Sequence, residues 1–327
     1  MSGEIFTKER YMRRLILVIL LCAAGLTADA QKTDSLLVMF WNVENFFDYI
    51  DQGTGESDKE FSSYGARHWT KSRFYAKCDS FAKTVMWIGD RYGRIPDVIG
   101  LAEVENRGVL TKLLEYTLLR KYDYSIVHKE SGDRRGIDVA LLYRRSSMNL
   151  CSRSFVTPFL GGKKISTRDI LHAGMKTHDG QEIDFLVNHH PSKYGGIQES
   201  DDKRKAAIST MLHMCDSLGR GNIISMGDFN DTPDGGQFRM VNEILVNKGA
   251  GLHERGEGTI RYKGKWELID FFLTGSEIRA SEMQVVRIPF LMVYDKRYPG
   301  EKPLRTYSGP RYIGGVSDHC PILLWIN

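Results

Sequence analysis

The sequence predicts one domain of mixed α and β structure, and three observations lead to that class. Seven short apolar runs have the length and the β-branched and aromatic content of buried strands. Helical periodicity appears between several of these runs. No stretch rich in Pro, Gly or Ser divides the 327-residue chain, and its 42% hydrophobic residues can form a sizeable core.

The predicted strands are SLLVMFWN (35–42), DVIGLAE (97–103), IDVALLY (137–143), IDFLVNH (183–189), NIISMGD (222–228), ELIDFFL (267–273) and PILLWI (321–326). Helices are predicted around residues 78–88, 109–117 and 203–218, where apolar side chains recur on one face. The polar stretch 51–68 is predicted to be the longest loop and to be exposed.

Residues 1–30 have the pattern of a secretory signal peptide, with Met12 as a candidate start. Arg13 and Arg14 precede the apolar run Leu15–Leu26, and an A-x-A cleavage site follows at residues 28–30. The apolar run is short for a transmembrane helix. We therefore predict an exported protein, periplasmic or extracellular, with no stable membrane insertion after cleavage.

The remaining chain, residues 31–327, keeps four cysteines: Cys78, Cys151, Cys215 and Cys320. Four cysteines allow three disulfide pairings in an oxidising compartment. A chain of this size does not need cross-links to be stable, so free buried thiols are favoured.

Oxygen-bearing and imidazole side chains stand at the ends of several predicted strands. Each has an ordinary explanation, since Asp and Asn form turns, a Glu can face solvent, and a lone His is more often structural. Asp270 is harder to explain in this way, because a carboxylate within an apolar strand needs a partner. Together they predict one functional site at the strand ends. The residues are Asn42, Glu103, Glu105, His189, Asp228, Asn230, Asp270, Asp318 and His319.

The chain resembles the endonuclease/exonuclease/phosphatase superfamily, the deoxyribonuclease I-like group, and most closely its secreted bacterial branch. The resemblance implies a four-layer α/β (α+β) sandwich, in which two packed mixed β-sheets are flanked by helices. It also implies that residues 31–327 form a single catalytic domain with a metal site across one edge of the sheets. Seven segments carry it, in the family's order: FWNVENFFD, PDVIGLAEVENRGVL, RGIDVALLY, VNHHPSKYGG, MGDFNDTP, WELIDFFL and PLRTYSGPRYIGGVSDHCPI.

The resemblance also implies a role for each site residue. Glu103 matches the principal metal ligand, and Asn42 a position near the metal and phosphate. Asp228 and Asn230 match the pair that positions the nucleophile and the phosphate. Further matches are the Asp–His dyad and extra metal or water ligand (Asp270, Asp318, His319), the second histidine (His189, with His190 as the alternative register) and phosphate- or substrate-binding residues (Arg168, Ser192, Lys193).

The chemistry of these side chains supports the same interpretation. Carboxylate and amide oxygens, without Cys/His spacing suited to zinc, indicate a hard cation. We expect Mg²⁺, with Mn²⁺ or Ca²⁺ as alternatives, held by Glu103 together with Asp318 or Asn42. His319, oriented by Asp270, is a candidate general base for the attacking water, and Asp228 is the other candidate. His189 is expected to bind the phosphate or to protonate the leaving oxygen.

The predicted function is that of a secreted, divalent-metal-dependent phosphodiesterase, with an endonuclease acting on DNA or RNA favoured. The net charge of +4 is compatible with a polyanion without requiring one. Basic loop residues could follow a phosphate backbone without reading bases, although such residues are ordinarily just solvated. These are Lys71, Arg73, Arg134, Arg135, Lys203–Lys205 and Arg261–Lys265.

Three alternatives stay open beside the nuclease. The same site could serve a phosphatase, or a phospholipid or sphingomyelin phosphodiesterase, since fold does not settle substrate. A lipid enzyme needs an exposed apolar hairpin, for which IPFLMVY (288–294) is the candidate segment. The remote alternative is a non-catalytic binding protein. A monomer is expected.

Overall fold

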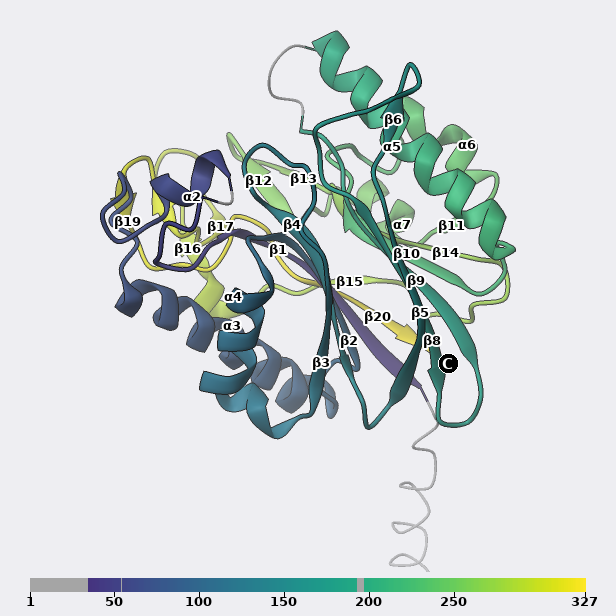
Figure 1. Cartoon of the computed structure of the whole chain (residues 1–327), viewed down its shortest axis with the longest axis horizontal. Coiled ribbons are helices and arrows are strands. Elements are labelled where there is room, and N and C mark those ends of the chain that lie inside the picture. Colours follow the sequence, from purple (N-terminus) through teal and green to yellow (C-terminus); the bar gives the residue numbers. More distant parts are fainter. Residues whose placement is uncertain (1–34, 54, 193–196) are drawn as a thin grey trace, which may run out of the picture. The chain divides into compact units, whose positions relative to one another are not determined.

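Two six-stranded mixed β-sheets form the centre of the fold (Figure 1). The structure is a computed structural model that describes residues 35–53, 55–192 and 197–327. The signal peptide predicted for residues 1–30 lies outside the described residues. Residues Leu36–Ile326 form one compact unit. The two-sheet architecture with flanking helices confirms the fold class that the sequence predicts.

The first sheet has the strand order β15-β20-β1-β2-β4-β3. Its strands β1 and β2 are parallel, and the remaining neighbours are antiparallel. The bounds are β1 (Leu36–Phe46), β2 (Val98–Val104), β3 (Tyr124–His128), β4 (Asp138–Arg144), β15 (Gln284–Val285) and β20 (Ile322–Ile326).

The second sheet has the strand order β11-β14-β10-β9-β8-β5. Here β9 and β10 are parallel, and the other neighbours are antiparallel. The bounds are β5 (Met148–Val156), β8 (Ile170–Thr177), β9 (Glu182–His189), β10 (Ile223–Asp228), β11 (Val246–Asn247) and β14 (Asp270–Thr274).

In the described residues, four two-stranded hairpins accompany the two large sheets. They pair β6 (Phe159–Leu160) with β7 (Lys163–Lys164), β12 (Ile260–Tyr262) with β13 (Lys265–Glu267), β16 (Met292–Tyr294) with β17 (Glu301–Pro303), and β18 (Tyr307–Ser308) with β19 (Arg311–Tyr312).

The long helices flank the pair of sheets, α3 and α4 on one side and α5 on the other (Figure 1). Asn106 caps α4 by accepting a hydrogen bond from the backbone N–H of Val109 at 3.0 Å, and Gly93 ends α3 at φ 73°. The helices are α2 (Glu56–Glu60), α3 (Lys71–Tyr92), α4 (Arg107–Tyr116), α5 (Ile197–Leu218), α6 (Arg239–Asn242) and α7 (Ala250–Glu254). The 3₁₀ turns are η1 (Leu118–Lys121), η2 (Gly236–Phe238) and η3 (Pro289–Leu291).

Strand β1 shows why the sequences of the central strands are continuous apolar runs. Val38 and Phe40 join the core that both sheets share, whereas Met39 and Trp41 point to the opposite face and join the core under α3 and α4. Both faces of the strand are therefore buried. The sheets approach closely at Gly100, where a Cβ atom would lie only 2.7 Å from the sulfur of Met226 on the other sheet.

The structure departs from the sequence prediction in several elements. Strands β3, β5 and β8 were not predicted, and β5 is an edge strand with many exposed side chains, which weakens its apolar pattern. The predicted strand 267–273 is broken, so Asp270 begins β14 instead of lying inside a strand. The stretch 51–68 is not simply an exposed loop, because it contains α2 and buries Asp58 and Phe61.

The four cysteines after residue 34 are free, as favoured, but only three of them are buried, since Cys151 is exposed. Within the described ranges, no helix is long and apolar enough to cross a membrane.

Candidate active site

The strand pairing of the second sheet brings three predicted site residues to one edge. Asp228 is the register partner of His189 on its parallel neighbour β9 and of Asp270 on its antiparallel neighbour β14. Gly227 makes the close fit of β10 against β9 possible, because a Cβ atom there would lie 2.5 Å from the backbone oxygen of Asn188. The predicted cluster at the end of β10 is therefore a direct consequence of strand register.

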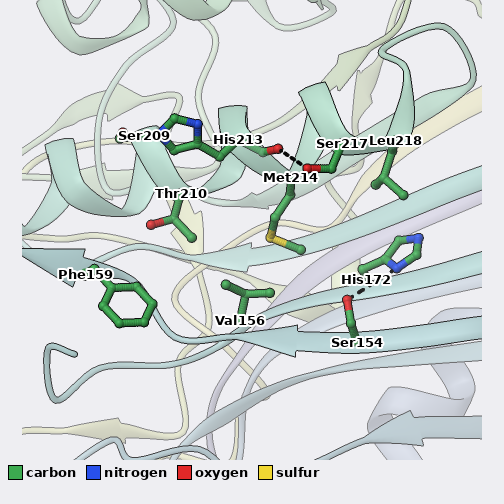
Figure 2. A pocket seen from close by; sticks show the side chains of 10 residues that line it. All are labelled: Ser154, Val156, Phe159, His172, Ser209, Thr210, His213, Met214, Ser217 and Leu218. Carbon is green, nitrogen blue, oxygen red and sulfur yellow. Dashed lines mark hydrogen bonds between the residues drawn. The ribbon is translucent and has the colours of Figure 1, made fainter. Parts of the chain in front are cut away.

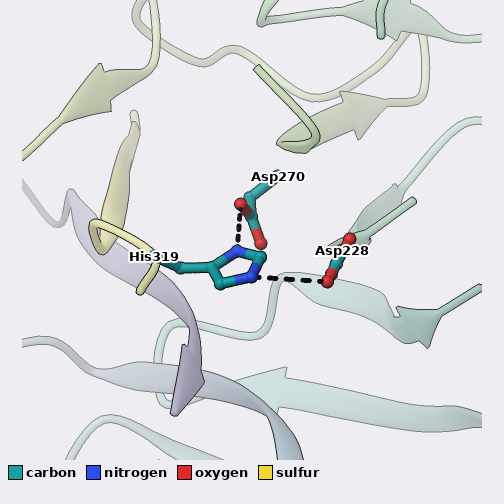
Figure 3. Close-up of side chains that lie close together, drawn as sticks. All are labelled: Asp228, Asp270 and His319. Carbon is teal, nitrogen blue, oxygen red and sulfur yellow. Dashed lines mark hydrogen bonds and ion pairs between the residues drawn. The ribbon is translucent and has the colours of Figure 1, made fainter. Parts of the chain in front are cut away.

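His319 lies between two of these carboxylates (Figure 3). Its Nδ1 is 2.8 Å from Oδ2 of Asp270, and its Nε2 is 3.9 Å from Oδ2 of Asp228. The Thr259 hydroxyl donates to the same oxygen of Asp270, and Trp41 Nε1 donates to the backbone oxygen of His319 at 2.9 Å. Asp270 thus orients the imidazole, as the Asp–His dyad predicts.

The two predicted histidines have opposite electrostatic environments. Burial disfavours the charged form of His319, but Asp270 and then Asp228 outweigh it, so its pKa is raised well above the usual range. Burial lowers the pKa of His189 far below its usual range, and Arg168 and Arg135 act in the same direction. His189 Nε2 is 3.7 Å from Asp228. At neutral pH the site therefore contains one imidazolium and one neutral imidazole.

Asp228 is the central carboxylate of the site. Asn42 Nδ2 donates to its Oδ2, and the backbone N–H of Asn230 donates to its Oδ1, both at 3.0 Å. Burial and then Asp270 raise the pKa of Asp228 to about 7, against the opposing effect of His319. Asn230 has φ 50° and donates from Nδ2 to the His190 backbone oxygen at 2.9 Å, so the turn after β10 is held in a specific conformation.

Glu103 lies in a bulge of β2, in the left-handed region at φ 63°. The bulge redirects its side chain toward a second irregular segment, at the end of β1, where Asn45 has φ 50°. The Asn45 backbone N–H donates to Oε2 of Glu103 at 2.8 Å. Burial opposes ionisation of Glu103, but Arg135 and this N–H outweigh it and lower its pKa. Glu103 is therefore an ionised carboxylate.

Asp318 lies at the exposed side of the site, with its side chain 40% exposed. Its Oδ2 is 3.0 Å from Nη2 of Arg305, which also donates to Oε1 of Glu44 at 2.8 Å. The buried Lys77 donates to the Glu44 backbone oxygen and to Thr306 Oγ1. Burial lowers the pKa of Lys77 to about 8, and burial together with Asp318 raises that of Glu44 to about 7.

Arg168 is placed differently from a residue that simply faces substrate. It is buried, and it donates to the backbone oxygens of His189 (3.2 Å) and His190 (2.7 Å) and to Asp133 (3.2 Å). It thereby ties the end of β9 to the loop before β4. Ser192 is exposed beyond this strand end, and Lys193 lies outside the described residues.

The alternative histidine and the second glutamate are both buried. His190 packs edge-on against Phe229, with ring centroids 5.1 Å apart, and within the described parts of the chain neither of its ring nitrogens has a hydrogen-bond partner. Glu105 accepts a hydrogen bond from the backbone N–H of Asp48 at 2.7 Å. The register in which His189 belongs to the site is therefore the one the geometry favours.

The donor set fits a hard divalent cation. Glu103 is ionised and buried, and among the described residues the Oδ1 atom of Asp270 has no hydrogen-bond partner. One carboxylate oxygen of Asp228 and one of Asp270 lie within 4.8 Å of each other. Asn42 uses its Oδ1 to accept from the Glu44 backbone N–H at 3.0 Å, which makes it a positioning group for Asp228. Oxygen ligands of this kind suit Mg²⁺, Mn²⁺ or Ca²⁺.

Two cavities differ in their relation to these residues. A polar cavity of about 210 Å³ borders the site, lined by Glu44, Asn45, Phe61, Arg67, Arg305 and Tyr307 among others. A larger, more apolar cavity of about 510 Å³ lies between β5 and α5, where Ser154 and His172 face Met214 (Figure 2). Neither lining contains a predicted site residue, but the smaller cavity includes Asn45 and Arg305, which contact Glu103 and Asp318.

Sequence reasoning missed the partners of the predicted carboxylates. Arg135 counted only as one of several basic loop residues, and Arg305, Glu44, Asn45 and Lys77 were not singled out. The signal was weak, since their roles depend on two bulges that a period-two pattern does not reveal. Two other basic residues have contacts outside the site: Arg134 pairs with Glu56 at the surface, and Arg261 donates to the Tyr298 and Pro299 backbone oxygens.

Comparison with known proteins agrees with this fold. The model of the endonuclease/exonuclease/phosphatase family matches residues 37–327. No curated protein matches the sequence. Solved structures with the same fold include a humanized TDP2 from D. rerio (14% identity, 90% of this chain and 100% of that chain, TM-score 0.57). A family protein from Bacteroides thetaiotaomicron (17% identity, 89% and 97%, TM-score 0.57) and that organism's mannosyl-6-phosphatase Bt3783 (15%, 89% and 99%, TM-score 0.56) are similar as well.

Proposed function

Because the chain belongs to the endonuclease/exonuclease/phosphatase family, whose members hydrolyse phosphoester bonds, we propose that it is a divalent-metal-dependent phosphodiesterase, with DNA or RNA as substrate. The observation that carries this proposal is the contact of His319 with Asp270 on one side and its approach to Asp228 on the other. A buried carboxylate pair around one imidazole, at the ends of strands, provides acid and base groups within reach of one phosphate.

Each residue's proposed role follows from its charge. Asp228, whose pKa is raised to about 7, accepts the proton of the attacking water. His319, held cationic by Asp270, donates to a phosphate oxygen, and the neutral His189 is a second hydrogen-bonding group beside Asp228. Asn230 orients the water or phosphate without adding negative charge. Glu103 and Asp318 would hold the cation, which would supply positive charge to neutralise the phosphate oxygens and the charge that develops during displacement.

A nucleic acid backbone is the substrate that the surroundings support best. Arg135 and Arg305 pair with Glu103 and Glu44 and have half-exposed side chains, and the polar cavity beside Asn45 offers room for a group attached to the phosphate. These contacts suit phosphate and sugar rather than base edges, so little sequence preference is expected. One structure with this fold, a D. rerio TDP2, is complexed with a single-stranded DNA product.

The test is hydrolysis of supercoiled plasmid by the purified protein, with EDTA or with added Mg²⁺. Bis-(p-nitrophenyl) phosphate, p-nitrophenyl phosphate and mannose 6-phosphate serve as parallel substrates, with His319→Ala as the inactive control. Magnesium-dependent nicking that the variant lacks would support the endonuclease. Turnover of the monoesters alone would move the proposal to a phosphatase. If none of the substrates is hydrolysed, the result would favour the non-catalytic binding protein.

One feature favours a lipid phosphodiesterase as the second candidate. The β6–β7 hairpin exposes Phe159 (48%) and Leu160 (41%) beside Lys163 and Lys164. Strand register places it at the end of the sheet where His189 lies, because β5 ends at Val156. The candidate hairpin at 288–294 is only partly exposed, since Ile288 and Leu291 are buried and Tyr294 is 61% exposed. Release of phosphocholine from sphingomyelin vesicles tests this candidate.

The proposal includes export. It is supported by the charged, apolar and A-x-A pattern of residues 13–30. N-terminal sequencing of the protein recovered from a periplasmic fraction or culture medium should begin at Gln31. Recovery of an uncleaved chain from the cytoplasm would contradict it.

A further inference from the structure

The Glu103 carboxylate shares its oxygens with an arginine that the sequence did not single out. Arg135 places Nη1 3.4 Å from Oε1 of Glu103 and Nη2 3.3 Å from Oε2. The same guanidinium donates from Nη2 to Asn45 Oδ1 at 2.7 Å. The contacts with Glu103 are long for charge-assisted hydrogen bonds, which are usually 2.7–2.9 Å. Arg135 thus makes long contacts with the Glu103 carboxylate and a shorter hydrogen bond with Asn45.

The backbone of Arg135 is fixed while its guanidinium is half exposed. Its N–H donates to Asp133 Oδ1 at 2.9 Å, and its backbone oxygen accepts from Ser57 at 3.2 Å. Asp133 is in turn held by Arg168 at 3.2 Å. The Arg135 side chain is 42% exposed, against 13% for Glu103. A rigidly anchored backbone with a solvent-facing guanidinium allows the side chain to turn without rearrangement of the loop.

We propose that Arg135 shares Glu103 with the divalent cation: it neutralises the carboxylate when no cation is bound and binds the substrate's phosphate when the cation takes its place. This inference rests on the proposed function. A carboxylate this buried needs a positive partner in either condition. Two cations on one carboxylate repel each other, whereas a phosphate placed between them attracts both. The planar guanidinium suits bidentate binding to either anion.

The competition predicts a specific change in cation affinity. In Arg135→Ala no ion pair has to be broken before the cation binds, so its Kd for Mn²⁺ should fall roughly tenfold relative to the unmodified protein. Arg134→Ala is the matched control, because it removes an equal charge from the neighbouring position, where Arg134 pairs with Glu56 in solvent. That control should shift the Kd by less than about twofold.

The second measurement concerns the anion. Inorganic phosphate binding to the cation-saturated protein should weaken roughly tenfold in Arg135→Ala and remain near normal in Arg134→Ala. Isothermal titration calorimetry measures both affinities without any hydrolysis. Arg135→Gln provides a second variant if the alanine variant folds poorly, since its amide can still donate to Asn45.

The outcomes separate this inference from the function on which it rests. Tighter Mn²⁺ binding and weaker phosphate binding in the Arg135 variants, with neither change in Arg134→Ala, would support the inference. Mn²⁺ binding no tighter than in Arg134→Ala, or unchanged phosphate binding, would overturn it while leaving metal-dependent hydrolysis intact. An unmodified protein that binds no Mn²⁺ and hydrolyses its substrate equally in EDTA would overturn both.

Discussion

Nδ1 of His319 lies 2.8 Å from Oδ2 of Asp270, although the two residues are 49 positions apart in the chain. Asp270 opens β14, and His319 comes just before β20, which belongs to the other sheet. The contact therefore spans the two sheets at their common edge. Any change that weakens it should act on the site while leaving the cores of both sheets in place.

Asp270→Asn should lower turnover by about 10²–10⁴-fold, because an amide neither fixes the same tautomer nor supports the charge on His319. The pKa of His319, followed by NMR, should fall from its raised value toward the usual range. Asp184→Asn is the matched control. Asp184 Oδ1 lies 2.7 Å from Nε2 of His172, and this pair is not part of the candidate site. Equal losses in both variants would indicate a general structural effect.

Asp228→Asn should lower turnover by at least ~10²-fold, in the range typical of a lost general base. The amide preserves the size of the side chain but accepts no proton from the attacking water. The measurement is metal-dependent hydrolysis of bis-(p-nitrophenyl) phosphate, with circular dichroism to show that the fold persists. Near-normal turnover in this variant would exclude Asp228 as the base and return that role to His319.

The sequence predicted the parts of the site that depend on strand ends. His189, Asp228 and Asp270 meet because β9, β10 and β14 are neighbours. The apolar runs placed His189 and Asp228 at strand ends, whereas Asp270 was predicted within a strand and instead begins β14. It could not predict the surroundings of Glu103, because two bulges and three left-handed residues (Glu44, Asn45 and Glu103) set the direction of that side chain. Left-handed backbone conformations are unusual for residues other than Gly, so no local sequence pattern predicts them at these positions.

Arg168 illustrates a different limit of sequence reasoning. The resemblance suggests a phosphate contact, and the structure shows a buried guanidinium that holds two backbone oxygens and Asp133. Both roles use the same chemistry of Arg, since its planar donors suit any cluster of oxygens. Only the three-dimensional arrangement shows which oxygens are within reach.

Arg168→Ala should therefore lower the free energy of unfolding by about 2–4 kcal/mol, because it removes the guanidinium hydrogen bonds to Asp133 Oδ2 and to two buried backbone oxygens. Urea denaturation measures the change. Arg153→Ala, on the exposed face of β5, is the control and should change stability by less than about 0.5 kcal/mol. If the two variants unfold at the same urea concentration, the interpretation of Arg168 as a structural tie is wrong.

His190 should make the fold sensitive to acid. Burial, Arg168 and Arg204 lower its pKa to about 3, whereas the unfolded chain protonates it near the ordinary value of 6.5. The unfolded state therefore binds more protons between these values, and stability is full above 6.5 and declines as the pH falls toward 3, by up to about 1.4 kcal/mol per pH unit.

His190→Phe removes this proton uptake while keeping a flat ring against Phe229. The difference in unfolding free energy between the variant and the unmodified protein should shift in favour of the variant, by roughly 2–3 kcal/mol, between pH 8 and pH 4.5. The contribution of the neighbouring His189 is present in both proteins and cancels in this difference. Urea denaturation at the two pH values, in EDTA, measures it. A difference that stays constant with pH would show that His190 is not buried in neutral form, and the packing of its ring against Phe229 would then have to be reassigned.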